Sequence, residues 1–158
     1  MIKITKQSDI EKNYEYMLKT IESFLEDETD IIANLSNISA VINEYIEDLN
    51  WCGFYFLKDN DLVLGPFQGK PACIRIKPGK GVCFAAIQKG SILNVPDVED
   101  FPSHIACDSD TKSELVSPIY KNGVVYGVLD LDSPKLNRFT NTESHYINLV
   151  CEKISKFL

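Results

Sequence analysis

The stretch that decides the fold is SELVSPIYKNGVVYGVLDLD, residues 113–132. It consists of two runs rich in β-branched and other apolar residues, separated by Asn122-Gly123. This dipeptide is typical of a type I′ hairpin turn, because asparagine and glycine tolerate the positive φ angles that the turn requires. In the second run Asp130 and Asp132 alternate with leucines, so their side chains are expected on one face of the strand. The sequence therefore predicts an antiparallel hairpin that ends in two aligned carboxylates.

Further strands precede the hairpin, beginning with the aromatic-rich run WCGFYFL at 51–57, which is typical of a strand. In chain order the expected strands are 51–57, 61–67, 74–76, 91–95, 113–120 and 124–132. Residues 79–90 open with glycines and are expected to form a loop that leads into a short helix. The polar stretch 96–112 is longer than most loops, and loops of that length often bind ligands or act as lids.

Amphipathic helices are expected on both sides of the strand region. Residues 10–25 carry apolar side chains at spacings of three and four, and so does the stretch 32–46. A third helix is expected over 140–158, because Thr140 and Glu143 have the spacing of a capping box. Helices, then strands, then a helix predict an α+β fold, in which an antiparallel sheet is covered by helices on one side.

The chain length of 158 residues fits one domain, with N-terminal helices in 1–48, the sheet and its loops in 51–132 and the C-terminal helix in 140–158. The net charge of -7 disfavours a nucleic-acid partner, because such a surface repels phosphate. No apolar run approaches the ~18–20 residues of a membrane span. No stretch resembles a signal peptide or a membrane-surface helix, so we expect a cytoplasmic protein without a membrane partner.

Five cysteines are present, and an odd number in a reducing compartment argues against a structural disulfide framework. Cys52 lies in an expected strand and Cys151 in an expected helix, so we interpret both as small buried apolar residues. Cys73, Cys83 and Cys107 fall in or beside irregular segments, where redox or metal chemistry is more accessible. These three are therefore the candidates for a function.

Cys107 lies in the loop sequence HIACDSD, three residues after His104. A loop cysteine can be accessible to solvent, and backbone amides can stabilise its thiolate, but the spacing alone leaves a reactive and a packed cysteine equally open. Zinc is the main alternative, and its Cys3His ligand set would be Cys73, Cys83, His104 and Cys107. Nine residues separate Cys73 from Cys83. Because structural zinc ligands usually come in closer pairs, a metal site is disfavoured.

Acidic and aromatic side chains mark a second candidate region. Aspartate is depleted in strands, so Asp130 and Asp132 form either a solvated end of the sheet or a wall that faces a cationic or polarised ligand. Glu114, at the start of the preceding strand, could join them across the hairpin or could be a solvated or capping residue. Trp51 and Tyr55 share a strand face, which favours core packing but also suits a pocket for an apolar part of a ligand.

Taken together, these segments resemble the free methionine-(R)-sulfoxide reductases, which are enzymes built on a GAF domain. The resemblance runs from about residue 50 to residue 132 and rests on NWCGFYF, GPFQGKPACIRI, GKGVC, NVPDVEDFP, HIACD, SELVSPI and GVLDLDSP. Many GAF domains share the last hairpin, whereas the cysteines in ACIRI, GVC and HIACD are specific to these reductases. The sequence departs from the family pattern at Phe84 and Ser103, where glycine is expected.

The resemblance implies a GAF-like α+β fold, in which an antiparallel sheet is flanked by N- and C-terminal helices. It also implies that Cys107 attacks the sulfoxide, that Cys73 resolves the product and that Cys83 is a third redox cysteine. Attack on the sulfoxide sulfur would leave a sulfenic acid, which a second thiol converts into a disulfide. A thioredoxin-like dithiol would then reduce that disulfide. No bound cofactor or metal is implied, and we expect a homodimer by analogy.

The resemblance also implies how the substrate is held. An acidic set would bind the ammonium group and polarise the sulfoxide, and its members would be Glu114, Asp130 and Asp132. The walls of the pocket would be the side chains of Trp51 and Tyr55 around the methyl group and the amides of Ile105, Ala106 and Cys107 around the carboxylate. Clustered acids can donate the required proton, because crowded like charges raise at least one pKa. The alternative function is a non-enzymatic GAF sensor that binds a small molecule or responds to an oxidant.

Overall fold

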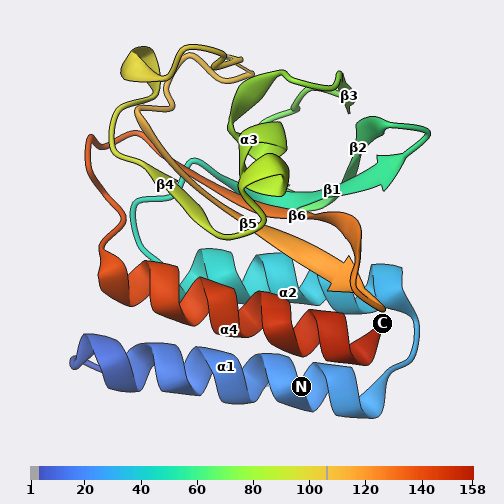
Figure 1. Ribbon diagram of the computed structural model, residues 1–158. Helices are drawn as coiled ribbons and strands as arrows, with labels where there is room; N and C mark the ends of the chain where they lie inside the picture. Colours follow the sequence, from blue (N-terminus) through green and yellow to red (C-terminus); the bar gives the residue numbers. More distant parts are fainter. Residues whose placement is uncertain (1–3, 106) are drawn as a thin grey trace.

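The computed structural model describes residues 4–105 and 107–158, so the predicted substrate contact Ala106 lies outside the described residues. A sheet lies between a layer of long helices and a group of loops around one short helix (Figure 1). In chain order the elements are α1 (Ile10–Asp27), α2 (Ile31–Tyr45), β1 (Trp51–Lys58), β2 (Asp61–Gly69), β3 (Arg75–Ile76), α3 (Gly81–Lys89), β4 (Leu93–Val95), the 3-10 helix η1 (Val98–Asp100), β5 (Ser113–Lys121), β6 (Val124–Ser133) and α4 (Asn141–Phe157).

The six strands form one antiparallel sheet in the order β3-β2-β1-β6-β5-β4. β1 and β6 are the central pair, so the first and last strands of the chain lie side by side. The β5–β6 hairpin turns at Asn122 and Gly123, whose φ angles of 51° and 77° are both positive, as the sequence predicts. The antiparallel sheet expected from the strand pattern is confirmed.

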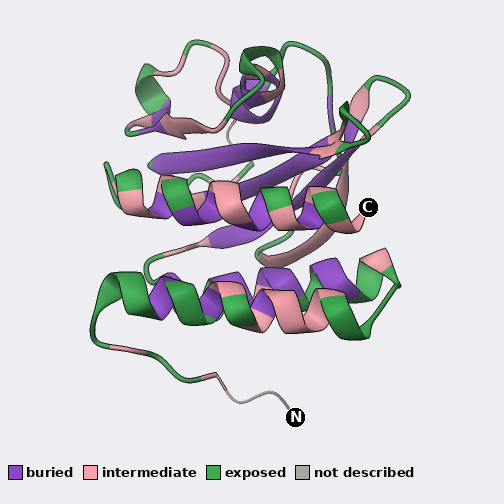
Figure 2. Ribbon diagram, turned by 60° about the horizontal axis from the view of Figure 1, so that its bottom comes forward, coloured by how far each residue is buried: buried purple, intermediate pink, exposed green. Residues whose placement is uncertain are grey.

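The three long helices cover one face of the sheet. α2 and α4 pack against the strands, and α1 lies beneath these two helices as an outer layer (Figure 1). Their outer faces are exposed and their inner faces are buried (Figure 2). The short helix α3 lies on the opposite face, because its apolar residues Val82 and Phe84 pack there against the sheet. The prediction of helices on one side is therefore right for the long helices and wrong for α3.

Side-chain caps fix where the long helices begin. Asp9 and Asp30 accept hydrogen bonds from backbone amides in the first turns of α1 and α2, at 2.9 and 2.8 Å. The predicted capping box of α4 is confirmed, since Thr140 and Glu143 bond reciprocally at its start. None of the helices in the described part of the chain is long and apolar enough to cross a membrane.

The alternation of side chains along the strands divides the apolar core into two parts. Leu129 and Leu131 of β6 face the long helices, in the part of the core where Cys52 and Cys151 are buried, as the sequence predicts. Val128 faces the opposite side and packs in the second part, together with residues of α3. Because side chains alternate with a period of two, the two aspartates of β6 also face this second side.

Candidate active site

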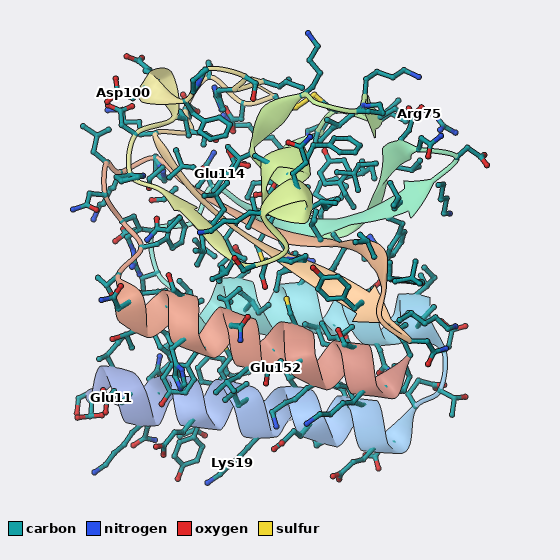
Figure 3. All side chains as sticks on the ribbon, viewed as in Figure 1. Glu11, Lys19, Arg75, Asp100, Glu114 and Glu152 are labelled. Carbon is teal, nitrogen blue, oxygen red and sulfur yellow. A yellow bond between two sulfur atoms is a disulfide. The ribbon has the colours of Figure 1, made fainter. Side chains whose placement is uncertain are left out.

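A cavity of about 570 Å³, including its open mouth, lies on the α3 side of the sheet. Strands β1, β5 and β6 form its floor, while α3 and the loops that precede β3 and β5 form its walls. Figure 3 shows Glu114 on this side of the sheet, near α3. The predicted site residues that line the cavity are Trp51, Tyr55, Cys83, Ile105, Cys107, Glu114, Asp130 and Asp132. The fold thus brings together side chains that are far apart in the sequence.

Two of the predicted redox cysteines are joined in a disulfide at the edge of this cavity. Cys73 and Cys107 are bonded to each other, with their Cα atoms 5.7 Å apart and a separation of 34 positions along the chain (Figure 3). The bond links the loop after β2 to the long loop before β5. Cys107 is exposed, whereas Cys83 is a free and buried cysteine of α3. The zinc set considered from the sequence is not assembled in this form, because two of its sulfurs are bonded to each other.

The three acids of the predicted site meet on the cavity side of the β5–β6 hairpin. Glu114 pairs with Asp132 across the two strands, and Val116 pairs with Asp130. Glu114 and Asp130 are each 6% exposed, so neither belongs to a solvated end of the sheet. Asp132 is partly buried and lines the cavity. Of the alternatives left open by the sequence, the acidic wall is therefore the arrangement found.

The buried position of these acids favours their protonated forms. Burial raises the pKa of Glu114 well above its usual range, and the charges of Asp130 and Asp132 add to the rise. Burial raises the pKa of Asp130 to about 7, although hydrogen bonds from Cys83 and Glu114 oppose this rise. Burial also raises the pKa of Asp132. Near neutral pH the cluster therefore holds protons that it can donate to a ligand.

Aromatic rings form one wall of the cavity. Trp51 and Tyr55 stack with their ring centres 5.8 Å apart. Phe67 of β2 stacks on Trp51, with their ring centres 5.3 Å apart. The Tyr55 hydroxyl donates a hydrogen bond of 2.9 Å to the carbonyl oxygen of Cys73. The wall is thus held rigidly, and it also positions the loop that carries one half of the disulfide. The sequence did not single out Phe67, because it comes next to Trp51 only when β1 and β2 pair in the fold.

Polar contacts that sequence reasoning missed hold the loop of Cys107 in place. The Lys70 ammonium lies 2.6 Å from a carboxylate oxygen of Asp110 and 3.7 Å from one of Asp108. The side-chain amide of Asn50 donates hydrogen bonds to Asp108 at 3.1 Å and to Thr111 at 2.9 Å. The sequence feature that could have pointed to these contacts is that Asp108 directly follows Cys107. These contacts hold the loop to the residue before β1, Asn50, and to the residue after β2, Lys70.

The predicted amide contacts to a substrate carboxylate are arranged differently in this disulfide form. The amide of Cys107 donates a hydrogen bond of 3.0 Å to the carbonyl oxygen of Ile105, so it is engaged within the loop. The Ile105 side chain lines the cavity and packs with the second part of the core. A substrate carboxylate can therefore use the Cys107 amide only after this internal bond opens.

One group of residues has the composition of a metal site. The ligand atoms of Cys83, Glu114 and Asp130 all lie within 4.8 Å of one another, and all three side chains are buried. The Cys83 thiol donates to Asp130 at 3.5 Å. A sulfur and two carboxylates in one place can hold either protons or a cation.

Comparison with known proteins identifies the family. The family model described as the GAF domain matches residues 20–158. The chain is a GAF-domain protein. It is 48% identical to Protein YtsP of Bacillus subtilis (strain 168), over 100% of this chain and 99% of that protein. It is 40% identical to the free methionine-R-sulfoxide reductase of Escherichia coli (strain K12), over 92% and 88% of the two chains.

Solved structures agree with the sequence comparison. The X-ray structure of free methionine-R-sulfoxide reductase from Neisseria meningitidis, in complex with its substrate, superposes on this GAF-domain protein with a TM-score of 0.95. The two are 41% identical, over 99% of this chain and 95% of that one. The protein is thus closely related to the free methionine-R-sulfoxide reductases along nearly its whole length. The GAF-like α+β fold expected from the resemblance is confirmed.

Proposed function

We propose that this protein reduces free methionine-(R)-sulfoxide to methionine, with Cys107 as the attacking residue. The observation that carries the proposal is the Cys73–Cys107 disulfide beside a cavity whose floor holds Glu114, Asp130 and Asp132. A disulfide at this place is the oxidised product that the reaction would leave. The close relationship to free methionine-R-sulfoxide reductases supports the same activity.

The cavity suits one zwitterionic amino acid. It lies between the sheet, α3 and two loops, so we propose that it admits a small ligand but not a folded peptide. Ionised members of the acid cluster can pair with the substrate ammonium, and the stacked rings of Trp51 and Tyr55 can enclose the methyl group beside the sulfur. Residues of the loop around Ile105 and Ala106 are proposed to receive the carboxylate. Peptide-bound methionine sulfoxide lacks these free charges and should be excluded.

The proposed reaction begins with two coupled events at the sulfoxide. The Cys107 thiolate attacks the sulfur while a protonated carboxyl group donates its proton to the oxygen. Glu114 is the proposed donor, because burial and two neighbouring acids keep its pKa high. Transfer of the hydroxyl group to the cysteine sulfur then releases methionine and leaves Cys107 as a sulfenic acid. The sulfoxide sulfur is reduced by two electrons and the cysteine sulfur is oxidised by two.

The proposed cycle closes through the second thiol. The Cys73 sulfur attacks the Cys107 sulfenic acid, which releases water and forms the observed disulfide. An external dithiol, proposed to be thioredoxin-like, then reduces the disulfide by exchange. Because Cys107 is exposed at the disulfide, such a partner can reach its sulfur without unfolding the sheet. Cys83 remains a proposed third redox cysteine, although its burial keeps it protonated in this form.

The test is stereospecific turnover with the purified protein. With thioredoxin, thioredoxin reductase and NADPH, free L-methionine-(R)-sulfoxide should drive NADPH oxidation, while the S epimer and a peptide-bound sulfoxide should not. Cys107→Ser should lower turnover by at least about 1,000-fold, since the nucleophile is lost. Cys151→Ser, a buried cysteine outside the cavity, is the matched control and should remain active. Full activity of Cys107→Ser, or nucleotide binding with no sulfoxide turnover, would overturn the proposal.

A further inference from the structure

The buried cluster of Cys83, Glu114 and Asp130 brings together a sulfur and carboxylate oxygens, which proton donation alone does not require. Its three ligand atoms come from three elements, α3, β5 and β6, and lie within 4.8 Å of one another. His104, in the loop before β5, adds a nitrogen, because its Nε2 atom lies 3.9 Å from a carboxylate oxygen of Glu114. Sulfur, nitrogen and carboxylate oxygen are the three donor types that zinc uses in proteins.

A second observation shows that this cluster lacks a positive partner. The Oδ1 atom of Asp130 is buried, and among the residues that the structure describes it has no donor beyond the proton that Glu114 can share with this carboxylate, since Cys83 bonds to Oδ2. Within the same residues, His104 is the sole basic side chain at ion-pair distance from Glu114, and none lies that close to Asp130. A buried acceptor without a donor costs free energy. A ligand that brings positive charge to Asp130 would recover that free energy.

We propose that Cys83, Glu114 and Asp130, with His104 as a fourth ligand, bind Zn²⁺ or another borderline-soft divalent cation. A tetrahedral zinc ion has bonds of ~2.0–2.3 Å and so spaces its ligands ~3.5 Å apart. The donor atoms of Cys83, Glu114 and Asp130 already lie within 4.8 Å of one another, and the His104 Nε2 atom lies 3.9 Å from the Glu114 carboxylate. Side-chain rotations would bring the four donors to the spacing of zinc ligands. Mg²⁺ and Ca²⁺ require sets made of oxygen and are not expected to bind here.

Protons and the cation compete for the same atoms. A cysteine coordinates zinc as its thiolate and an acid as its carboxylate, so these ligands must give up any protons that they hold. A bound cation neutralises the charges that burial penalises, and it therefore displaces these protons. Zinc binding should consequently release protons and should become tighter as the pH rises.

The ion would also regulate the reaction, a consequence that rests on the proposed function. The carboxyl group that donates its proton to the sulfoxide cannot do so while it coordinates a cation. The ion would further occupy the part of the cavity next to Asp130, which the substrate needs. Zinc should therefore act as a reversible inhibitor that competes with methionine sulfoxide, rather than as a resident cofactor.

The binding test uses the disulfide form of the whole protein, because Cys73 and Cys107 cannot ligate a metal while they are bonded to each other. Co²⁺ serves as the spectroscopic probe, and the protein should bind one ion with a thiolate-to-metal charge-transfer band that Zn²⁺ abolishes by displacement. Cys83→Ser should lose the band. Cys151→Ser should keep it, since that thiol lies in the other part of the core.

Affinity distinguishes this site from adventitious binding. Asp130→Asn should weaken zinc binding by at least about tenfold, since even partners outside the ligand set contribute 10–100-fold. Glu152→Gln, an exposed acid of α4, should leave the affinity unchanged. The absence of a charge-transfer band in the disulfide form, or its persistence in Cys83→Ser, would overturn the proposal.

Inhibition is tested separately, so that the two proposals fail independently. A reduced and desalted sample is mixed with methionine-(R)-sulfoxide, and the methionine formed in a single turnover is quantified at increasing Zn²⁺. The inhibition midpoint should rise with sulfoxide concentration, match the zinc affinity of the disulfide form when extrapolated to zero sulfoxide, and be reversed by a chelator. If no methionine forms even without zinc, the proposed function fails while the binding result stands. Unchanged methionine formation at saturating zinc would overturn the inhibitory role.

Discussion

The environments of Cys107 and Cys83 determine which thiol can act as a nucleophile. Cys107 is exposed at the mouth of the cavity, where water can stabilise a thiolate once the disulfide is reduced. Cys83 is buried, and its burial, together with the charges of Asp130 and Glu114, raises the pKa of its thiol. Because the thiolate is the reactive form, these environments support Cys107, rather than Cys83, as the proposed attacking residue.

Cys73→Ala should separate the first chemical step from the recycling step. In the proposed cycle the first turnover needs only the thiol of Cys107 and the acids, so about one methionine should form per protein molecule. Turnover with thioredoxin should fall by at least about tenfold, because the sulfenic acid of Cys107 has lost its partner. Quenched-flow methionine analysis measures the first step, and a nucleophilic probe specific for sulfenic acids should label Cys107.

The matched control for this variant is Cys52→Ala, which removes a buried thiol on the helix side of the sheet. It should show neither the turnover defect nor the sulfenic-acid label. Undiminished thioredoxin-dependent turnover of Cys73→Ala would show that another thiol resolves the intermediate, and Cys83 would then be the residue to examine.

At the level of single residues, the sequence predicts which face of a strand a side chain occupies better than it predicts how deeply that side chain is buried. The period of two along β6 correctly places Asp130 and Asp132 on one side of the strand. It does not show that Asp130 is 6% exposed, because burial depends on α3 and on the long loop that cover this face. The contacts of Lys70 with the loop of Cys107 were equally invisible, since about forty residues separate these charges and neither belongs to a periodic pattern.

At the level of elements, the predictable features are those set by local sequence. The turn at Asn122-Gly123 and the capping box at Thr140 depend on neighbouring residues only, and both are found where the sequence predicts them. The placement of α3 depends on which sheet face still has apolar surface to cover. The long helices already occupy the other face, so this short apolar helix packs on the cavity side and brings Cys83 to the acids.

Glu143→Gln should weaken the contact between α1 and α4. The Glu143 carboxylate accepts a hydrogen bond of 2.8 Å from the Tyr14 hydroxyl and lies 3.1 Å from the Arg138 guanidinium. These hydrogen bonds, with those from Thr140, hold the pKa of Glu143 at about 2 although burial opposes the shift. The variant should lose about 2 kcal/mol of unfolding free energy, the scale of a hydrogen bond to a charged group. Urea unfolding at pH 7, followed by circular dichroism, measures this loss.

A second glutamate of α4 provides the control for this measurement. Glu152 is exposed, and within residues 4–105 and 107–158 its one hydrogen-bond partner is Asn148 of the same helix, at 2.9 Å. Glu152→Gln should therefore change the unfolding free energy by less than about 0.5 kcal/mol. Equal effects of the two substitutions would show that the buried contacts of Glu143 do not stabilise the helix layer.

At the level of the whole molecule, the buried acids of the site lower the folding stability when they ionise. Folding buries Glu114, Asp130 and Asp132 close together, and this burial favours their protonated forms. The chain also carries a net charge of -7, so ionisation of these acids adds to an existing repulsion. A cluster that is able to donate protons at neutral pH therefore costs stability as the pH rises.

The unfolding free energy should consequently be higher at pH 5 than at pH 8. The pKa of Asp130 rises from its usual 3.8 to about 7 in the folded protein, so between these values the native state binds more protons than the unfolded state. The contribution of Asp130 to the unfolding free energy is fully present below about pH 4 and is lost as the pH rises through about 7. Between pH 5 and pH 8 this loss is about 2 kcal/mol. Asp130→Asn should reduce this slope without removing it, because Glu114 and Asp132 remain. Urea unfolding of the disulfide form across this range is the measurement, and greater stability at pH 8 than at pH 5 would show that the acids are ionised in the native state.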